Sequence, residues 1–589
     1  MLNSVSPLRQ AILWPFAGAI VIIAMGRLLP GWLRRLAALG VVIASFLNLW
    51  SLRTGMGTQT EIFWDPVNFF RASPAWRVDG LSLLIGMALA ALLAMAVLAE
   101  RGSEFQAVAW LGLVLAALTG ALATVMAANL LALALGSGWI DLVLITMAMA
   151  IGGNAGRVLW RVIVPGVAST LILIACAVQV NTQVGTVSLT AQNIPLQIVA
   201  WLSVAGMLRL MVFPLHPRGV HPIQTAIPWA LAVGVGGYLL ARAQAVAPGL
   251  GGYSWMLSTG ITALLAGGIL AWTSLAGSIE RLREAQDRQI TEERDGRDRA
   301  FLMGVVVHQT GWVLIVASLL DNGVAWALSG LVLALAVLTP WEGGDQAKES
   351  APWPPWAAEV SRKLYSWWDR AALGSMPDLV EAWWRRARLW LRRGRIWLPV
   401  VALASLAGLP FTAGALGRWP FYGALIRQGS AKVLVVALIA DTFLMAGLWL
   451  AFRRLLERAD ERIPASVVIA GSVLDILLVV IGTASGSLSE VLFVTPVPWP
   501  KVSVWGLGLV YGLPWLLGGW LAYAGSRWGR ILAYGQRIVT LDWLFEGASW
   551  LGRRVVHGVH WLGRIGEGEG WLGWALILLT LGGILFLAR

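Results

Sequence analysis

One stretch of the chain, residues 207–242, constrains the fold more than any other. It is apolar enough to cross a membrane, yet it contains Arg209, His216, His221 and four prolines. A charge near the centre of a bilayer costs at least about 2.5–3.5 kcal/mol, and proline leaves a carbonyl that lipid cannot satisfy. A second interrupted stretch, residues 403–421, follows in the other half of the chain. Paired interruptions of this kind are typical of inverted-repeat transporters.

The composition excludes a water-soluble globule of this length. Hydrophobic residues make up 58% of the 589 residues, and charged residues make up 13%. The single cysteine, Cys176, lies in an apolar run, which excludes a disulfide framework and a thiolate metal site. The sequence has no cysteine cluster and no phosphate-binding glycine fingerprint. We therefore expect no metal, no cofactor and no catalytic centre in this chain.

The apolar runs predict an all-α polytopic membrane protein with about sixteen transmembrane helices. We expect two inverted five-helix repeats, a broken helix in each repeat, and a C-terminal amphipathic surface helix before the last span. The expected segments are residues 1–106 (spans 1–3), 107–254 (first repeat, spans 4–8), 255–455 (second repeat, spans 9–13), 456–525 (spans 14–15), 526–569 (amphipathic helix) and 570–589 (final span).

Charge in the loops predicts the orientation of the chain. The loops that follow odd-numbered spans hold most of the arginine and lysine residues. Because cytoplasmic loops are enriched in these residues, we expect a multi-pass protein of the plasma (inner) membrane with both termini on the non-cytoplasmic side.

Two basic segments are rich in tryptophan and are expected at the membrane surface. Residues 341–396 alternate clusters of tryptophan and arginine, which predicts a cytoplasmic interfacial helix on anionic lipids. Nucleic-acid binding is excluded by the position of this insertion between two spans. Residues 526–569 either strap neighbouring subunits together or contact lipid alone.

Several segments resemble motifs of the antiporter-like membrane subunits of respiratory complex I and of their Mrp-antiporter relatives. Residues 209–216 are similar to the seventh-span motif Lys-Ser-Ala-Gln-x-Pro-x-His, with Arg209 in place of the lysine. Residues 222–242 match the length and the Gly-x-Tyr-Leu-x-Ala-Arg ending of the segment that follows. Asp79 resembles the acid of a Val-Asp-Gly-Leu-Ser motif and is expected to cap the third span.

The second half carries two further motifs of this family. Residues 297–312 keep the glutamine and glycine of a tenth-span motif as Gln309 and Gly311. Residues 406–418 are similar to Leu-Ala-Gly-x-Pro-x-x-x-Gly-Phe-x-Ser-Lys, again with arginine, Arg418, for lysine. The resemblance covers most of residues 79–455. About sixteen spans with a surface helix before the last one is the arrangement of the L-type subunit of complex I.

This resemblance implies a membrane-arm subunit of a complex-I-like assembly, with other membrane subunits as partners. The family carries protons along buried titratable groups, several of them lysines, whose pKa desolvation can shift. Arginine stays protonated, so Arg209 and Arg418 can supply a fixed electrostatic field or pair with a carboxylate, but they cannot relay a proton. The chain is thus either a proton-translocating subunit or a silenced structural version of one. A membrane subunit of a cation/proton antiporter or of an inorganic-carbon uptake system is the alternative.

The candidate site consists of buried charges and helix-breaking prolines. The charges expected on an ion path, or left as its remnant, are Asp141, Arg209, His216, His221, Arg299, His308, Arg418, Asp441 and Asp475. The prolines expected to break helices are Pro214, Pro222 and Pro410. Asp141 either pairs with Arg209 or is a helix-end carboxylate. We expect Arg418 to pair with Asp441 or another acid of the C-terminal half, and Asp475 to serve either an ion path or a structural ion pair.

Overall fold

The computed structural model describes most of the chain up to residue 525. The described residues are 6–55, 60–62, 73–100, 104–151, 153–184, 189, 194–213, 215, 222–246, 254–276, 289–319, 324–338, 398–427, 430–457, 465–492, 504–525, 539, 550, 554, 557 and 558. The chain divides into two compact units, Met1–Leu532 and Ala533–Arg589. The insertion expected at 341–396, nearly all of the surface helix expected at 526–569 and the final span expected at 570–589 lie outside the described residues.

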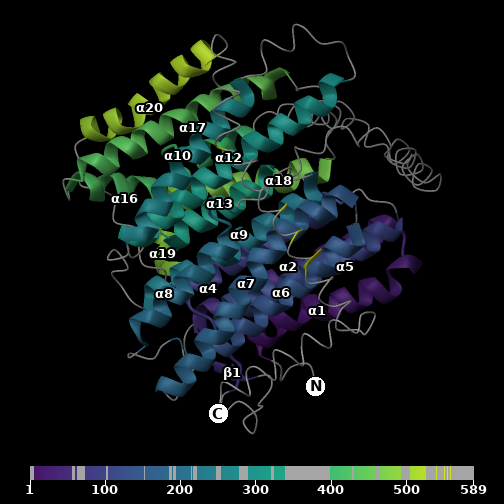
Figure 1. Cartoon of the computed structure of the whole chain (residues 1–589). Helices are drawn as coiled ribbons and strands as arrows, with labels where there is room; N and C mark the ends of the chain where they lie inside the picture. Colours follow the sequence, from purple (N-terminus) through teal and green to yellow (C-terminus); the bar gives the residue numbers. More distant parts are fainter. Residues whose placement is uncertain are drawn as a thin grey trace, which may run out of the picture. The chain divides into compact units, whose positions relative to one another are not determined.

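Helices make up nearly all of the described part of the first unit (Figure 1). The first eight are α1 (Pro7–Met25), α2 (Gly31–Ser51), α4 (Gly80–Leu98), α5 (Glu104–Val125), α6 (Leu130–Ile151), α7 (Gly153–Val184), α8 (Leu196–Leu210) and α9 (Pro222–Val246). They are followed by α10 (Ser254–Ala276), α12 (Gln289–Leu319), α13 (Val324–Leu338), α16 (Ala413–Arg427), α17 (Ala431–Glu457), α18 (Ala465–Thr483), α19 (Ser485–Leu492) and α20 (Val504–Ala524). Residues 398–406 are helical as well, and two 3-10 turns, η2 (Gly26–Leu28) and η3 (Leu52–Gly55), follow α1 and α2.

These helices are long and apolar enough for a multi-pass membrane protein. Within the described residues, ten helices meet the length and hydropathy of a membrane span, or eleven if one bent pair is counted as a span. The bent pair is α18 and α19, whose axes differ by 95° at Ala484. The described part therefore confirms the polytopic all-α class, while the count of sixteen spans and the two inverted repeats remain expectations.

A pair of very short strands departs from the all-α expectation. β1 (Thr60–Ile62) and β2 (Ala75–Arg77) lie antiparallel, with Glu61 opposite Trp76. Both belong to the polar loop between α2 and α4, where backbone groups have no helical partners and pair with each other instead.

The helices form two groups that meet at α4, α9 and α13. In the first group α5 packs on α1 and α6, α7 packs on α6 and α8, and α8 packs on α9. In the second group α10 packs on α12 and α17, and α17 also packs on α20. Helix α13 joins the groups, because it packs on α4 and α9 as well as on α16 and α18. Figure 1 shows these long helices running alongside one another.

Glycines set the distance between α10 and α12. A Cβ at Gly267 of α10 would clash with the backbone of α12, and one at Gly304 or Gly311 of α12 would clash with the backbone of α10. A Cβ at Gly260 of α10 would lie 2.7 Å from the Ile315 side chain and 3.1 Å from the Gly311 carbonyl oxygen. The glycines of each helix are one heptad apart and face each other in antiparallel order. Small residues let helix backbones approach closely where lipid removes the hydrophobic drive for association. This contact fixes the position of α12, which carries His308.

Asp79 caps α4, as the sequence predicts. Its carboxylate accepts a hydrogen bond from the Ser82 amide at 2.9 Å, and the Ser82 hydroxyl accepts one from the Asp79 amide at 2.8 Å. The same carboxylate lies 2.7 Å from Arg242 of α9, which also donates to the hydroxyl of Tyr238 at 2.8 Å. Two separate family-like motifs are therefore joined by one ion pair.

Candidate functional site

Both interrupted stretches contain backbone in a conformation that side chains disfavour. Helix α8 ends at Met211, whose φ is +52°, and the turn after residues 398–406 contains Gly408 at +71° and Phe411 at +66°. Met211 and Phe411 are the two non-glycine residues with positive φ in the part of the chain that the structure describes. Strain of this kind persists only where the surroundings hold it, and it concentrates at functional sites. The breaks are thus built features of the fold.

The first break places Arg209 in the last turn of α8 and buries it against Asp141 of α6. The guanidinium Nη2 lies 2.9 Å from both carboxylate oxygens, and the two side chains are 1% and 6% exposed. The predicted pairing of Asp141 with Arg209 is therefore present, and Asp141 is not a helix-end carboxylate. Because a lone charge at this depth is expensive, each residue requires the other.

Helix α7 completes the first cluster, which we define as Asp141, Gly166, Thr170 and Arg209. The Thr170 hydroxyl donates to Asp141 Oδ2 at 2.6 Å and accepts from Arg209 Nη2 at 2.8 Å. The Gly166 carbonyl accepts from the same nitrogen at 3.0 Å. A Cβ at Gly166 would lie 2.8 Å from Asp141 Oδ1, so a side chain there would displace the carboxylate. The remaining guanidinium nitrogens, Nε and Nη1, meet no partner among the described residues.

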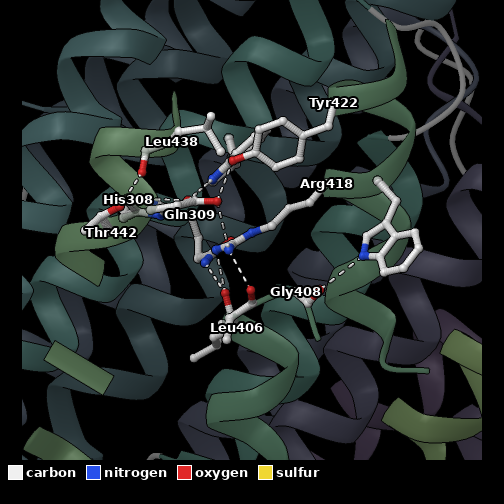
Figure 2. Close-up of polar contacts among 12 residues, drawn as sticks. His308, Gln309, Leu406, Gly408, Arg418, Tyr422, Leu438 and Thr442 are labelled. Carbon is white, nitrogen blue, oxygen red and sulfur yellow. Dashed lines mark hydrogen bonds and ion pairs between the residues drawn. The ribbon is translucent and has the colours of Figure 1, made fainter. Parts of the chain in front are cut away.

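The second break places Arg418 on α16, with its guanidinium turned back toward the carbonyls that the break leaves free. Nη2 donates to the Leu406 carbonyl at 2.6 Å and Nη1 donates to the Ala407 carbonyl at 2.7 Å. Figure 2 shows Arg418 extended between Leu406 and Tyr422. Helix-terminal carbonyls lack intrahelical donors, so a buried guanidinium here satisfies two of them. Arg418 therefore holds the break together through the backbone.

Asp441 of α17 is the acid of the second cluster, which we define as His308, Trp312, Arg418, Tyr422 and Asp441. Its Oδ2 accepts from the Tyr422 hydroxyl at 2.7 Å and lies 3.5 Å from Arg418 Nη1. Its Oδ1 accepts from the Trp312 indole at 3.2 Å and lies 3.1 Å from His308 Nε2. All of these groups are buried. The expected partnership of Arg418 and Asp441 is present, although the contact is longer than that of Arg209 with Asp141.

A small cavity adjoins the second cluster. It has a volume of about 20 Å³, and its polar lining comes from Gln309, Ser405 and Arg418. The Gln309 amide donates to the Leu406 carbonyl at 2.5 Å, as Figure 2 shows, so two side chains share that acceptor. A cavity of this size admits one water molecule, which the polar lining could hold.

The other predicted residues fall into two sets. His216, His221 and Pro214 lie outside the described residues, as does the side chain of Arg299. Pro222 begins α9, and Pro410 lies in the turn before α16. Asp475 is buried on α18, where its Oδ1 meets no partner in the described part of the chain. The structure thus assembles Asp141 with Arg209, and His308 with Arg418 and Asp441, but leaves Asp475 apart.

Sequence reasoning did not single out Thr170 or Tyr422 as site residues. Tyr422 follows Arg418 by four residues, a spacing that places both on one helix face and could have identified it. Thr170 had no comparable signal, since serine and threonine are common in membrane spans.

The chemistry available to the two clusters differs. Arg209 and Arg418 stay protonated, so they supply fixed positive charge and hydrogen bonds. Near Asp441 lies His308, whose side-chain type is the one with a pKa ordinarily near neutral, whereas the first cluster contains no titratable side chain besides its ion pair. Among the described residues no group of three or more histidine, cysteine, aspartate or glutamate side chains could hold a metal ion.

Comparison with known proteins places this geometry in a known fold. The sequence matches no protein-family model and no curated protein sequence. The structure is similar to a chain of the Mrp complex from Dietzia sp. DQ12-45-1b, with a TM-score of 0.73 at 16% identity over 99% of this chain. It is similar to a chain of the membrane-bound sulfane sulfur reductase, an archaeal respiratory membrane complex, with a TM-score of 0.68 at 15% identity over 98% of this chain. A chain of respiratory complex I from Thermus thermophilus matches with a TM-score of 0.57 at 16% identity over 82% of this chain.

The lengths of the matched chains differ. The alignments span 63% of the Mrp chain, 100% of the sulfane sulfur reductase chain and 98% of the complex I chain. Each of these chains comes from a multi-subunit membrane complex. The fold is therefore one found in chains of the Mrp complex and of respiratory complex I, as the sequence motifs predict.

Proposed function

We propose that this chain is an antiporter-like membrane subunit of a complex-I-like assembly in which the first proton path has been silenced. One observation carries the proposal: Arg209, at the break where the related motif has lysine, is locked in a buried ion pair with Asp141. A lysine at this position could lose its proton when desolvated, but a guanidinium cannot. The first cluster then acts as a permanent structural ion pair that fastens α8 to α6 and α7.

The second cluster supports a different role for the other half. Arg418 is also fixed in its charge, but Asp441 lies 3.1 Å from His308, a residue type that exchanges protons near neutral pH, and accepts a hydrogen bond from Tyr422. Partial retention of titratable groups in one half fits a subunit that has lost continuous proton translocation and kept local proton binding. A membrane subunit of this kind serves chiefly to hold its complex together.

The partners and the location of the chain belong to the same proposal. The partners are other membrane subunits, and the basic, tryptophan-rich residues 341–396 contact anionic lipids on the cytoplasmic face. The chain lies in the plasma membrane with both termini on the opposite side. Any electron transfer in such an assembly belongs to its other subunits.

A membrane subunit of a cation/proton antiporter is the second candidate. The observation that favours it is the similarity to the Mrp chain, which extends over 99% of this chain at a TM-score of 0.73, against 82% and 0.57 for complex I. Both candidates use the same fold, so the choice depends on what the chain assembles with.

Copurification separates the two candidates. The tagged chain is extracted from its native membrane in mild detergent, and the eluate is analysed by mass spectrometry and by absorbance for flavin, iron–sulfur clusters and haem. We expect redox subunits in the eluate. An eluate that holds only non-redox membrane proteins would instead favour the antiporter.

A transport measurement then tests whether the first proton path is inactive. The purified assembly is reconstituted in vesicles with a pH-sensitive dye, and the unaltered chain is compared with an Arg209→Lys variant. We expect no proton flux that depends on the first cluster in the unaltered chain. Flux that an Asp141→Asn substitution abolishes, while the assembly remains intact, would contradict the proposal.

A further inference from the structure

Asp475 is a buried acid that neither cluster uses. It lies near the middle of α18 with 7% of its surface exposed, and its Oδ1 meets no partner among the described residues. The outer face of the same helix is apolar and exposed, with Ile469, Val473 and Ile476 among its residues. An ionised carboxylate in such surroundings carries a large desolvation cost unless a cation offsets it.

A cation that balances an ionised Asp475 would have to come from the elements packed on α18. They are α4, α13, α16 and α19. Helices α4 and α13 and residues 398–406 contain no charged or titratable residue. On α19 the only such residue is Glu490, which is exposed and is an acid itself. Charge from this side cannot balance a carboxylate.

Helix α16 is the remaining candidate source of a cation. It carries Arg418, Tyr422 and, at its last residue, Arg427. Arg418 is bound to two backbone carbonyls and lies beside Asp441, and Tyr422 donates to Asp441. Arg418 is thus already beside another acid, Asp441. Among the side chains that the structure describes, which do not include that of Arg427, no cation pairs with Asp475.

The position of Asp475 links it to the second break. Two turns further along α18, Gly482 packs so closely on Thr412 that a Cβ at Gly482 would overlap the backbone of Thr412. Thr412 follows Phe411, the residue with φ of +66°. One turn before Asp475, Gly471 contacts Leu398. The buried face of α18 therefore lies along the interrupted segment from its start to its turn.

We propose that Asp475 is a proton-binding site, a carboxyl group that holds an exchangeable proton on α18 apart from both arginine clusters. A neutral carboxyl costs far less to bury than an ionised one. A metal cation would need several oxygen ligands, and the only side-chain oxygens of α4 and α13 are the hydroxyls of Ser82 and Ser329. Loss of the proton places a charge beside the interrupted segment, so proton exchange at Asp475 is coupled to the second break. This inference does not depend on which complex the chain belongs to.

Carbodiimide labelling tests the protonation state directly. Dicyclohexylcarbodiimide reacts with protonated, membrane-buried carboxyl groups, and the labelled peptide is identified by mass spectrometry. With the intact chain in detergent micelles, we expect label on Asp475 at neutral pH and loss of that label in alkaline buffer. Asp141, which is paired with Arg209 at 2.9 Å, is the internal control and stays unlabelled.

A second readout does not require a reactive probe. The Asp475→Asn variant should lack the infrared carbonyl band of a protonated carboxylic acid that the unaltered chain shows. A Ser472→Ala variant on the same helix should keep it and serves as the matched control. If Asp475→Asn does not fold, the labelling of the unaltered chain still decides the question.

Two results would overturn the proposal. Absence of label on Asp475 at every pH, together with no protonated-carboxyl band, would mean that the group is ionised and paired with a cation. Protection of Asp475 from the reagent by sodium or potassium chloride, but not by choline chloride, would assign the site to a metal cation.

Discussion

The first and second clusters place the same residue type at the same kind of helix break, yet they stabilise it differently. Arg209 uses one nitrogen to reach both oxygens of Asp141 at 2.9 Å, while its other two nitrogens meet no partner among the described residues. Arg418 donates to two backbone carbonyls at 2.6 and 2.7 Å and lies 3.5 Å from Asp441. Arg209 therefore has Asp141 as a close counter-charge beside the Gly166 carbonyl at 3.0 Å, whereas Arg418 lies farther from its acid and closer to two backbone carbonyls.

This difference decides what each acid is free to do. Asp141 is occupied by its arginine and by one hydroxyl, so protonating it would leave Arg209 uncompensated. Asp441 accepts from Tyr422 and Trp312 and lies beside His308, so its surroundings can adjust to a change in protonation. The proposed division of roles, a structural pair in the first cluster and local proton binding in the second, rests on this difference.

The largest expected effect comes from removing Asp141, the acid of the first cluster. We expect Asp141→Asn to lower the free energy of unfolding by about 3–5 kcal/mol, because it leaves Arg209 buried and unpaired. Thermal unfolding of the chain in detergent, followed by tryptophan fluorescence, measures the loss.

A double variant is the control for this prediction. Asp141→Leu combined with Arg209→Met removes both charges and should recover most of the lost stability. A double variant as unstable as Asp141→Asn would mean that packing, and not the unpaired charge, causes the loss.

The matching substitution in the second cluster should cost less. We expect Asp441→Asn to lower the free energy of unfolding by about 1–2 kcal/mol, since the amide oxygen still accepts from one of the two donors, Tyr422 or Trp312, and Arg418 keeps its two carbonyls. The same unfolding experiment measures it. A loss as large as that of Asp141→Asn would show that both arginines depend equally on their acids.

Substitution of Arg418 tests how much its hydrogen bonds to two backbone carbonyls contribute to stability. Arg418→Lys keeps a positive charge but replaces a planar fork with a point donor, so one of the two carbonyl contacts should be lost at a cost of about 1 kcal/mol. Unfolding midpoints of Arg418→Lys and Arg418→Met provide the measurement and its control. Equal midpoints for Arg418→Lys and the unaltered chain would show that the fork is not needed.

The ion pair of Asp79 and Arg242 lies at the edge of a span and is more exposed than the ion pairs of the two clusters, so it is the third case for comparison. Burial works against ionisation of Asp79, but the charge of Arg242 and the hydrogen bonds outweigh it, so the pKa of Asp79 lies below its usual value. A lowered pKa stabilises the fold above the unfolded-state pKa of about 3.9, and this contribution is lost as the pH falls through the folded-state pKa.

We therefore expect Asp79→Asn to lower the free energy of unfolding by less than about 1 kcal/mol at neutral pH. The difference between the variant and the unaltered chain should shrink as the pH falls below about 4. Unfolding midpoints across this pH range measure it. A difference that stays constant with pH would assign the contribution of Asp79 to helix capping alone.

Much of this arrangement follows from the sequence. An arginine in an apolar span requires a counter-charge, so Arg209 predicts an acid such as Asp141 on a neighbouring span, and Arg418 predicts Asp441. Motif order predicts the fold, which the structural comparisons bear out. The capping role of Asp79 follows from its place directly before an apolar helix.

Other parts have no sequence signal. The carbonyls that hold Arg418 belong to the backbone, and every residue has one. The bend between α18 and α19 occurs at Ala484 without a proline, so composition alone does not mark it. Nor does the sequence distinguish Asp441, which has four polar neighbours, from Asp475, since both are acids within apolar runs near the middle of a helix.

The glycine contact between α10 and α12 limits how the second half can move. Because the two backbones approach closely at Gly267, Gly304 and Gly311, where a single Cβ would clash with the opposite backbone, we expect the two helices to move as one rigid unit. His308 belongs to α12, and Asp441 belongs to α17, which packs against α10. His308 Nε2 and Asp441 Oδ1 lie 3.1 Å apart, so a movement that separates them must displace α17 relative to the pair of α10 and α12.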